Sequence, residues 1–280
     1  MLPEFFLKSI EAQYGAETAA RIVGGMRSAR RVSLRANRLK TDPEAVAALL
    51  TEARKDALRA LPAYEKGEIY LQSLSSMLPP LALMPQAGKD ILDMAAAPGG
   101  KTAQMAAMTG NRANITACEI NKIRAERLQY NLRRQGASRV NVMVRDAAKL
   151  EDFFRFDQIL LDAPCSGSGT LLETEPRGLS AFSEKLARNS AAVQLRLLRK
   201  ALTLLKPGGA MVYSTCSVLG IENEDVLRAG MKGFKAEIEP LSLPGIDRVP
   251  TLPASLPGAL CVCPTAEYEG FFMARIRKMG

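Results

Sequence analysis

The sequence predicts an α/β fold, in which a mostly parallel sheet is covered by helices and preceded by a small basic helical segment. From about residue 63, short apolar runs of strand length alternate with longer stretches of helical periodicity. This alternation is typical of parallel strands joined by crossover helices. Near the end of the chain, two apolar runs follow each other too closely for a crossover helix. We therefore expect them to form an antiparallel hairpin at the sheet edge.

The first 62 residues are predicted to be mostly helical. Apolar residues at helical spacing predict helices over Glu4–Tyr14 and Glu17–Met26. The run Thr41-Asp42-Pro43-Glu44 combines a capping residue, a proline and an acid, which is typical of a helix start. We expect that helix to continue over Ala45–Ala60.

The remaining residues, 63–280, are predicted to form a second, larger unit. The expected parallel strands are Asp90–Met94, Asn114–Glu119, Arg139–Val144, Gln158–Asp162 and Ala210–Thr215. The expected helices are Leu74–Leu83, Gly100–Met108, Asn121–Gln135, Glu184–Leu205 and Asn223–Met231. The hairpin strands are Ala259–Cys263 and Gly270–Ile276, which bring the sheet to seven strands. The Pro- and Gly-rich stretch Leu241–Pro257 is predicted to be a loop.

Composition narrows the classes of function. The chain has 280 residues, with 38 Lys and Arg against 29 Asp and Glu, and a net charge of +9. A basic balance favours a polyanionic partner, most often nucleic acid. The chain has no histidine, which excludes Ser-His-Asp triads, Cys-His dyads and HExxH zinc sites. Acid–base chemistry must then use Asp, Glu, Lys, Tyr or Cys.

The five cysteines indicate a reducing compartment. Their number is odd, they are widely spread, and no two form a CxxC pair. Reduced thiols in a cytosol fit this pattern better than a disulfide framework or a metal site. The N-terminal residues lack the features of a signal peptide, and no stretch approaches the length of a membrane span. We therefore expect a cytoplasmic protein with no membrane association and no bound metal.

The stretch ILDMAAAPGGKT, from Ile91 to Thr102, runs from a strand through small residues into a helix. Small residues let a ligand approach the backbone, and a helix start offers free N–H groups. Glu119 and Asp146 end the next two strands, where a nucleoside could give hydroxyl and amine hydrogens to carboxylates. The alternatives are an ordinary tight turn and two carboxylates that cap helices.

Two cysteines follow neighbouring predicted strands. Cys165 lies in LDAPCSGSGT (161–170), and Cys216 lies in YSTCS (213–217). A polar, glycine-rich loop is an unusual place for a structural cysteine, so we expect both thiols to face one pocket. We expect Cys118 in the core, and Cys261 and Cys263 at alternate positions of an edge strand.

These motifs resemble those of the RNA cytosine-5 methyltransferase family, the Nop/Sun group that includes the RsmF- and RsmB-like bacterial rRNA methyltransferases. The resemblance covers roughly residues 30–276. It departs at Ala95, where the family usually has Cys. The matching segments are SLRANRLK (33–40), YLQSLSSML (70–78), residues 93–102, Asp146, residues 162–165, residues 215–216 and EGFF (269–272).

The resemblance implies a Rossmann-like class I methyltransferase fold with S-adenosylmethionine as the methyl donor. It implies Cys216 as the nucleophile and Cys165 as the residue that helps release the product. A base attacked by a thiol also needs a nearby acid, a role we give to Asp162, with Lys101 orienting Asp162 or the base. The residues implied to hold the donor are Ala95, Ala96, Ala97, Pro98, Gly99, Gly100, Lys101, Glu119, Asp146 and Asp162.

The expected partner is RNA, with ribosomal RNA placed ahead of transfer RNA. A catalytically silent RNA-binding protein of the same fold is an alternative, although the intact Asp162, Cys165 and Cys216 argue against it. A small-molecule methyltransferase needs neither two cysteines nor so many basic residues. We assign RNA binding to residues 1–62 and catalysis to residues 63–280. The cations behind this assignment could also form a solvated face; they are Arg21, Arg27, Arg30, Arg31, Arg35, Arg38 and Lys40.

Overall fold

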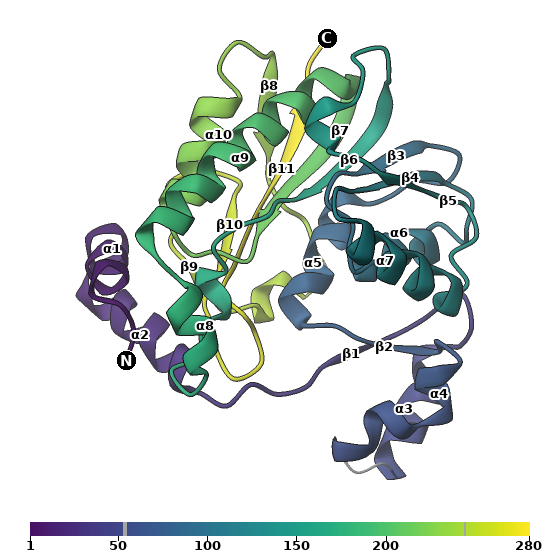
Figure 1. Ribbon diagram of the computed structural model, residues 1–280, viewed down its shortest axis with the longest axis horizontal. Helices are drawn as coiled ribbons and strands as arrows, with labels where there is room; N and C mark the ends of the chain where they lie inside the picture. Colours follow the sequence, from purple (N-terminus) through teal and green to yellow (C-terminus); the bar gives the residue numbers. More distant parts are fainter. Residues whose placement is uncertain (53–54, 244) are drawn as a thin grey trace.

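The fold is built around one central sheet (Figure 1). The computed structural model describes residues 1–52, 55–243 and 245–280. Across these residues, nine strands form the sheet in the order β5-β4-β3-β6-β7-β11-β10-β9, with β8 beside β11. Strands β3 to β7 are parallel, and β8 to β11 are antiparallel to their neighbours. The α/β fold and the terminal hairpin are therefore confirmed. The strands are β3 (Asp90–Asp93), β4 (Asn114–Glu119), β5 (Val140–Val144), β6 (Phe156–Asp162), β7 (Leu205–Thr215), β8 (Ala236–Glu239), β9 (Thr251–Leu252), β10 (Leu260–Val262) and β11 (Phe271–Lys278).

Helices cover both faces of this sheet because neighbouring strand residues point to opposite sides. Leu160 of β6 packs in a core with α5, α6 and α7, whereas Leu161 packs in a core with α9 and α10. The helices are α5 (Leu74–Leu83), α6 (Gly100–Met108), α7 (Lys122–Gln135), α8 (Pro176–Ala181), α9 (Glu184–Leu204) and α10 (Glu224–Gly230). Within the described residues, none of the helices is long and apolar enough to cross a membrane.

The N-terminal residues contact the rest of the chain in two places. Helices α1 (Glu4–Tyr14) and α2 (Ala16–Arg27) pack on the α9 side, where the Phe6 ring meets the Phe182 ring edge-on at 5.6 Å. Farther along, β1 (Leu34–Ala36) pairs with β2 (Ile69–Leu71) in a separate two-stranded antiparallel sheet. Figure 1 shows this ribbon leading to a small lobe with α3 (Pro43–Glu52) and α4 (Pro62–Glu65).

The structure differs from the sequence expectations in its smallest elements. The helix expected to reach Ala60 ends as α3 at Glu52, and a 3₁₀ helix covers Lys55–Ala60. Residues 53 and 54, which that prediction also covered, lie outside the described residues. Strands β8 and β9 raise the sheet from the expected seven strands to nine, and β9 lies within the predicted loop. Strands of two to four residues are too short for an alternating pattern to identify them.

Candidate active site

The predicted site residues gather at the carboxyl ends of the parallel strands. Asp93, Glu119 and Asp162 are the last residues of β3, β4 and β6. Asp146 follows β5, and Cys216 follows β7. This edge is where open α/β sheets bind their ligands, because the loops leaving each strand form a crevice there.

The two thiols that were predicted to face one pocket lie together. The Sγ atoms of Cys165 and Cys216 are 3.0 Å apart, and both side chains are partly exposed. The hydrogen bond to Cys216, burial and the charge of Glu222 raise the pKa of Cys165 well above its usual value. Cys118 is buried in the core, as expected. The edge-strand prediction for Cys261 and Cys263 is wrong, because β10 pairs with β9 as well as β11 and Cys263 follows the end of β10; both thiols are buried.

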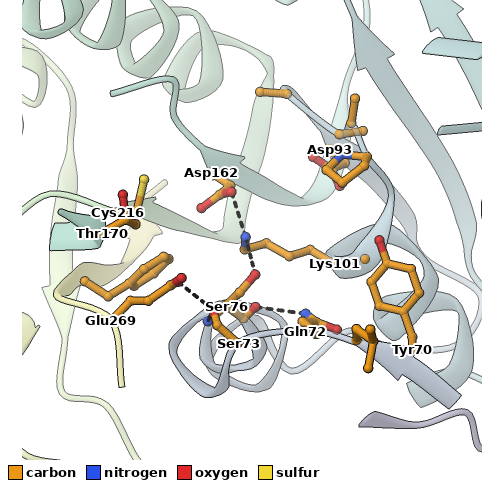
Figure 2. A pocket seen from close by; sticks show the side chains of 17 residues that line it. Tyr70, Gln72, Ser73, Ser76, Asp93, Lys101, Asp162, Thr170, Cys216 and Glu269 are labelled. Carbon is orange, nitrogen blue, oxygen red and sulfur yellow. Dashed lines mark hydrogen bonds and ion pairs between the residues drawn. The ribbon is translucent and has the colours of Figure 1, made fainter. Parts of the chain in front are cut away.

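Next to the thiols, Asp162 forms an ion pair with Lys101 (Figure 2). Nζ of Lys101 donates to Oδ2 of Asp162 and to Oγ of Ser76, both at 2.7 Å. Oδ1 of Asp162 accepts from Oγ of Ser214 at 2.8 Å. Burial lowers the pKa of Lys101, but the charge and hydrogen bond of Asp162 outweigh burial and raise it overall. Lys101 therefore carries its proton at neutral pH.

Two cavities meet at this pair. The lysine cavity, of about 330 Å³, is lined by Tyr70, Ser76, Lys101 and Glu269 among others. The carboxylate cavity, of about 310 Å³, is lined by Glu119, Asp146, Ile120 and Cys165 among others. Asp162 and Cys216 line both cavities. A ligand in either cavity would therefore touch the same reactive groups.

In the carboxylate cavity, Glu119 and Asp146 each use one oxygen to fix the local backbone. Oε1 of Glu119 accepts from the Asn121 amide at 2.9 Å, and Oδ1 of Asp146 accepts from the Ala148 amide at 2.9 Å. Each second oxygen lies 3.5 Å from an exposed arginine, Arg124 or Arg196. The capping roles considered from the sequence are therefore present, and one oxygen of each acid remains for a ligand.

The glycine turn between β3 and α6 forms a wall shared by both cavities. Gly99 has a φ of 106°, and a Cβ there would lie 2.9 Å from the side chain of Leu128. Asn131 fixes the turn from outside by donating to the Pro98 carbonyl at 2.8 Å. The turn lets a ligand reach the backbone because its residues carry no long side chains before Lys101.

Asp93 was quoted in the motif but given no role, and its environment is unusual. The side chain is fully buried beside the lysine cavity, and burial raises its pKa to about 7. Oδ2 accepts from Oγ1 of Thr102 at 2.7 Å, whereas Oδ1 has no hydrogen-bond partner among the described residues. Its position as the last residue of a buried strand was the only sequence signal.

Ser76 and Glu269 are two further residues of the lysine cavity that sequence reasoning left without a role. Both belong to segments quoted for the family resemblance. Glu269 accepts from Oγ of Ser73 at 2.7 Å, and its carbonyl accepts from Oγ of Ser75. Two segments that lie far apart in the sequence therefore close this cavity.

The basic N-terminal cluster makes contacts within the protein. Arg27 pairs with Glu173 at 2.7 Å, and Arg31 pairs with Glu267 at 2.8 Å. Arg30 donates to the carbonyls of Thr265 and Tyr268. Arg35 is half-buried and bonds Gln72 and Gln135. These contacts give several of the cations a structural role.

A groove of about 490 Å³ lies beside this cluster. Arg30, Arg31 and Arg59 line it, and it shares Gln72, Ser73 and Glu269 with the lysine cavity. The described residues contain no group of three or more acids and cysteines that could hold a metal ion. The groove therefore brings three arginines to the edge of the lysine cavity.

Two family models match the chain. The 16S rRNA methyltransferase RsmB/F model matches residues 80–277, and an RsmF/B-like ferredoxin-like domain matches residues 2–71. Among curated proteins, ribosomal RNA small subunit methyltransferase F of Shewanella loihica is 40% identical over 227 residues, covering 76% of this chain and 46% of the relative. The same-named protein of Salmonella paratyphi A is 41% identical over 224 residues, covering 76% and 45%. The chain thus spans about half the length of the curated relatives it matches.

Two solved structures share the fold over nearly the whole chain. A methyltransferase homolog protein from Pyrococcus horikoshii superposes with a TM-score of 0.85 and 31% identity, covering 99% of this chain and 95% of that one. NSun6 from Pyrococcus horikoshii, solved with SFG, superposes with a TM-score of 0.88 and 22% identity, covering 100% and 99%. The second likeness shows the fold alone.

Proposed function

The chain belongs to the RsmB/F methyltransferase family, and from that premise we propose that it is an S-adenosylmethionine-dependent RNA (cytosine-5-)-methyltransferase. The proposed product is 5-methylcytosine, formed through a covalent bond between Cys216 and carbon 6 of the base. The observation that carries the proposal is the pair of thiols 3.0 Å apart, beside Asp162, where two cavities meet. Ribosomal RNA is the proposed substrate, in keeping with the names of the curated relatives.

The carboxylate cavity fits the nucleoside part of the methyl donor. Glu119 suits the two ribose hydroxyls, and Asp146 suits an exocyclic amine, because both acids line the cavity and each bonds the backbone through its other oxygen. Ile120 and Pro164 supply apolar contacts for a purine ring. The turn from Ala95 to Lys101 lets the donor lie against the backbone. When bound, S-adenosylmethionine supplies an electrophilic methyl group.

The lysine cavity would take the target cytosine. Carbon 5 of cytosine is a weak nucleophile until a thiolate adds to carbon 6 and makes the ring an enamine. A negative charge on Cys216 is one of the causes that raise the pKa of Lys101, because the two charges attract each other. We propose that Cys216 adds to carbon 6 as a thiolate beside this ammonium. Addition moves negative charge toward the N3 edge, where the proton of the Asp162–Lys101 pair would be delivered.

Release needs a base that takes the proton from carbon 5. The electrons of that C–H bond then restore the C5=C6 double bond, and Cys216 leaves as a thiolate with the electrons of the C–S bond. With no histidine in the chain, Cys165 or a water that it positions is the base we propose. Its place beside Cys216 puts it next to the adduct.

The function is tested by giving the protein labelled methyl donor and total RNA, then sizing the labelled RNA. Bisulfite sequencing of the labelled fraction reads methylation at carbon 5 of cytosine. We expect label in the small-subunit ribosomal RNA at a discrete cytosine. Label in transfer RNA would mean that transfer RNA is the substrate. Label on an atom other than carbon 5 would overturn the proposed chemistry.

Replacing Glu119 with Ala should weaken binding of the methyl donor. The change removes one acceptor for ribose hydroxyls, and hydrogen bonds to charged groups contribute about 1.5–3 kcal/mol, so the loss in affinity should be about tenfold or more. The measurement is the rise in melting temperature with added donor, because a ligand that binds the native state stabilises it. Glu126→Ala, which changes an exposed acid of α7, is the matched control. An unchanged shift in Glu119→Ala would remove the ribose assignment.

We propose that residues 1–62 bind RNA and that residues 63–280 carry the catalytic unit. The groove lined by Arg31 and Arg59 adjoins the lysine cavity, so a single strand could pass along it into the site. The ion pair of Arg31 is exposed, and exposed pairs contribute only about 0–1 kcal/mol. Arg31 can therefore exchange Glu267 for a phosphate, whereas Arg30 braces the backbone.

Replacing Arg31 and Arg59 with Ala should weaken RNA binding across sequences. For every phosphate that the variant no longer neutralises, the log–log salt dependence of affinity should flatten by roughly 0.7 on single strands. The measurement is RNA affinity at several salt concentrations, with donor affinity unchanged. Lys8→Ala is the control, since this exposed lysine of α1 pairs with Glu4 outside the groove. If the salt dependence of RNA affinity is unaltered in the double variant, these arginines do not contact phosphate and form only a solvated surface.

A further inference from the structure

One buried carboxylate connects the loops that carry the two thiols. Glu222 is completely buried. Its Oε1 accepts from the Ser166 amide at 2.7 Å and from Nε2 of Gln194 at 3.3 Å. Its Oε2 accepts from Oγ of Ser166 at 2.5 Å and from Oγ of Ser217 at 2.6 Å. Because Ser166 follows Cys165 and Ser217 follows Cys216 in the chain, Glu222 holds the residue next to each thiol.

Neighbouring contacts strengthen this connection. Oγ of Ser168 and Oγ of Ser217 lie 2.8 Å apart, so the two loops also bond directly. Asn223 accepts from Thr215 at 2.6 Å and donates to the Ser217 carbonyl at 3.0 Å. Gly169 lies so close to Gly270 that a Cβ on it would be 2.0 Å from the Gly270 carbonyl oxygen. The Cys165 loop therefore has little freedom to move away from Cys216.

The negative charge of Glu222 also affects the groups around it, beyond the effect of its hydrogen bonds. A buried charge is costly unless it is well hydrogen-bonded, and Glu222 meets that condition with four donors. Within the described part of the chain, no lysine or arginine forms an ion pair with it, so its negative charge acts on its surroundings. One of the groups on which this charge acts is the thiol of Cys165.

We propose that Glu222 is a positioning residue that fixes the two thiols against each other and assigns their roles. It keeps Cys165 a neutral thiol, so that the base at carbon 5 is the water that Cys165 positions, while Cys216 supplies the thiolate. The two roles rest on the proposed function, whereas the positioning does not. The negative charge disfavours a second negative charge on Cys165, and it adds to the effects of the Cys216 hydrogen bond, burial and the Cys216 charge, which also raise the pKa of that thiol. The charged and titratable groups around the pair are Lys101 on α6, Asp162 on β6, Arg196 on α9, Tyr213 on β7 and Glu222.

The test is the pH profile of thiol alkylation in the protein without RNA or donor. Wild type, Glu222→Gln and Glu224→Gln are treated with iodoacetamide, and modification of each cysteine is read by peptide mass spectrometry. Glu224 is the matched control because it is also buried but bonds the Ser255 amide, away from the thiol loops. A fall of one pKa unit raises the thiolate fraction about tenfold. We expect about that gain in Cys165 alkylation near neutral pH in Glu222→Gln, and none in Glu224→Gln.

An unchanged Cys165 profile in folded Glu222→Gln would overturn the inference. If Glu222→Gln fails to fold, Ser217→Ala tests the positioning role instead. This change removes the hydrogen bond from Ser217 to Glu222, next to Cys216, and keeps the charge of Glu222. We then expect slower alkylation of Cys216 with an unchanged Cys165 profile, and equal rates for Cys216 would overturn the positioning role. A shifted profile without RNA methylation by any form of the protein would instead count against the proposed function alone.

Discussion

Replacing Cys165 with Ala should trap RNA on the protein, whereas replacing Cys216 with Ala should abolish both the adduct and methylation. Addition needs only the Cys216 thiolate, so a covalent complex still forms without Cys165, but its release fails. Without Cys216 no bond to carbon 6 can form, and we expect methyl transfer to fall below detection. The contrast follows from the two thiols lying 3.0 Å apart beyond the ends of neighbouring strands.

The measurement is a denaturing gel with labelled RNA and methyl donor. Cys263→Ala is the matched control, since it removes a buried thiol that lines neither cavity. The double variant lacking both reactive thiols should form no adduct. A trapped band with Cys216→Ala and none with Cys165→Ala would exchange the two roles.

Replacing Lys101 with Met should lower the rate of methyl transfer by about 10²–10⁴, the range for a lost general acid. In the proposed mechanism the ammonium is the proton source of the Asp162 pair, and it attracts negative charge on Cys216. Because its pKa is raised in the folded protein, this ion pair is present at neutral pH and is lost only in strongly alkaline solution. Wild-type rates should therefore show no loss from Lys101 between about pH 6 and pH 9, well below the ordinary lysine pKa of about 10.4.

Single-turnover methylation measures this effect apart from product release. Lys89→Met is the control, because Lys89 also pairs with an aspartate, Asp157, but lies half-exposed at 3.8 Å from it. We expect the control to stay within about twofold of wild type, as a surface pair contributes little. A Lys101→Met protein that is folded and fully active would remove Lys101 from the chemistry.

Sequence reasoning located the parts of the site that lie beside a strand end. Asp162, Cys165 and Cys216 could be placed because each follows a recognisable apolar run, and parallel strands bring their carboxyl ends to one edge. Roles for Ser76 and Glu269 could not be predicted, because only tertiary packing brings their distant segments to Lys101. No local sequence pattern therefore indicates that these two residues line the cavity.

The charge of the N-terminal segment predicted less of the structure than the pattern of strands did. The count of cations between Arg21 and Lys40 predicted a basic surface, but it could not show that Arg27 and Arg31 pair with Glu173 and Glu267. Those acids come from segments far along the chain, so no local pattern reports the pairing. The short strand β8 could not be predicted from local sequence either. Its Glu239 pairs with Arg275 and Arg277 of β11, which also lie far along the chain.

The place of β11 in the sheet bears on the order in which the protein can be completed during synthesis. This strand lies between β7 and β10, and it is made long after β7. Until it emerges from the ribosome, the outer edge of β7 has no partner, and unpaired edges favour aggregation. Phe271, its first residue, also lines the lysine cavity. The lysine cavity is therefore completed only after β11 has been made, and a nascent chain that stops after β10 should be protease-sensitive in a way that the chain through β11 is not.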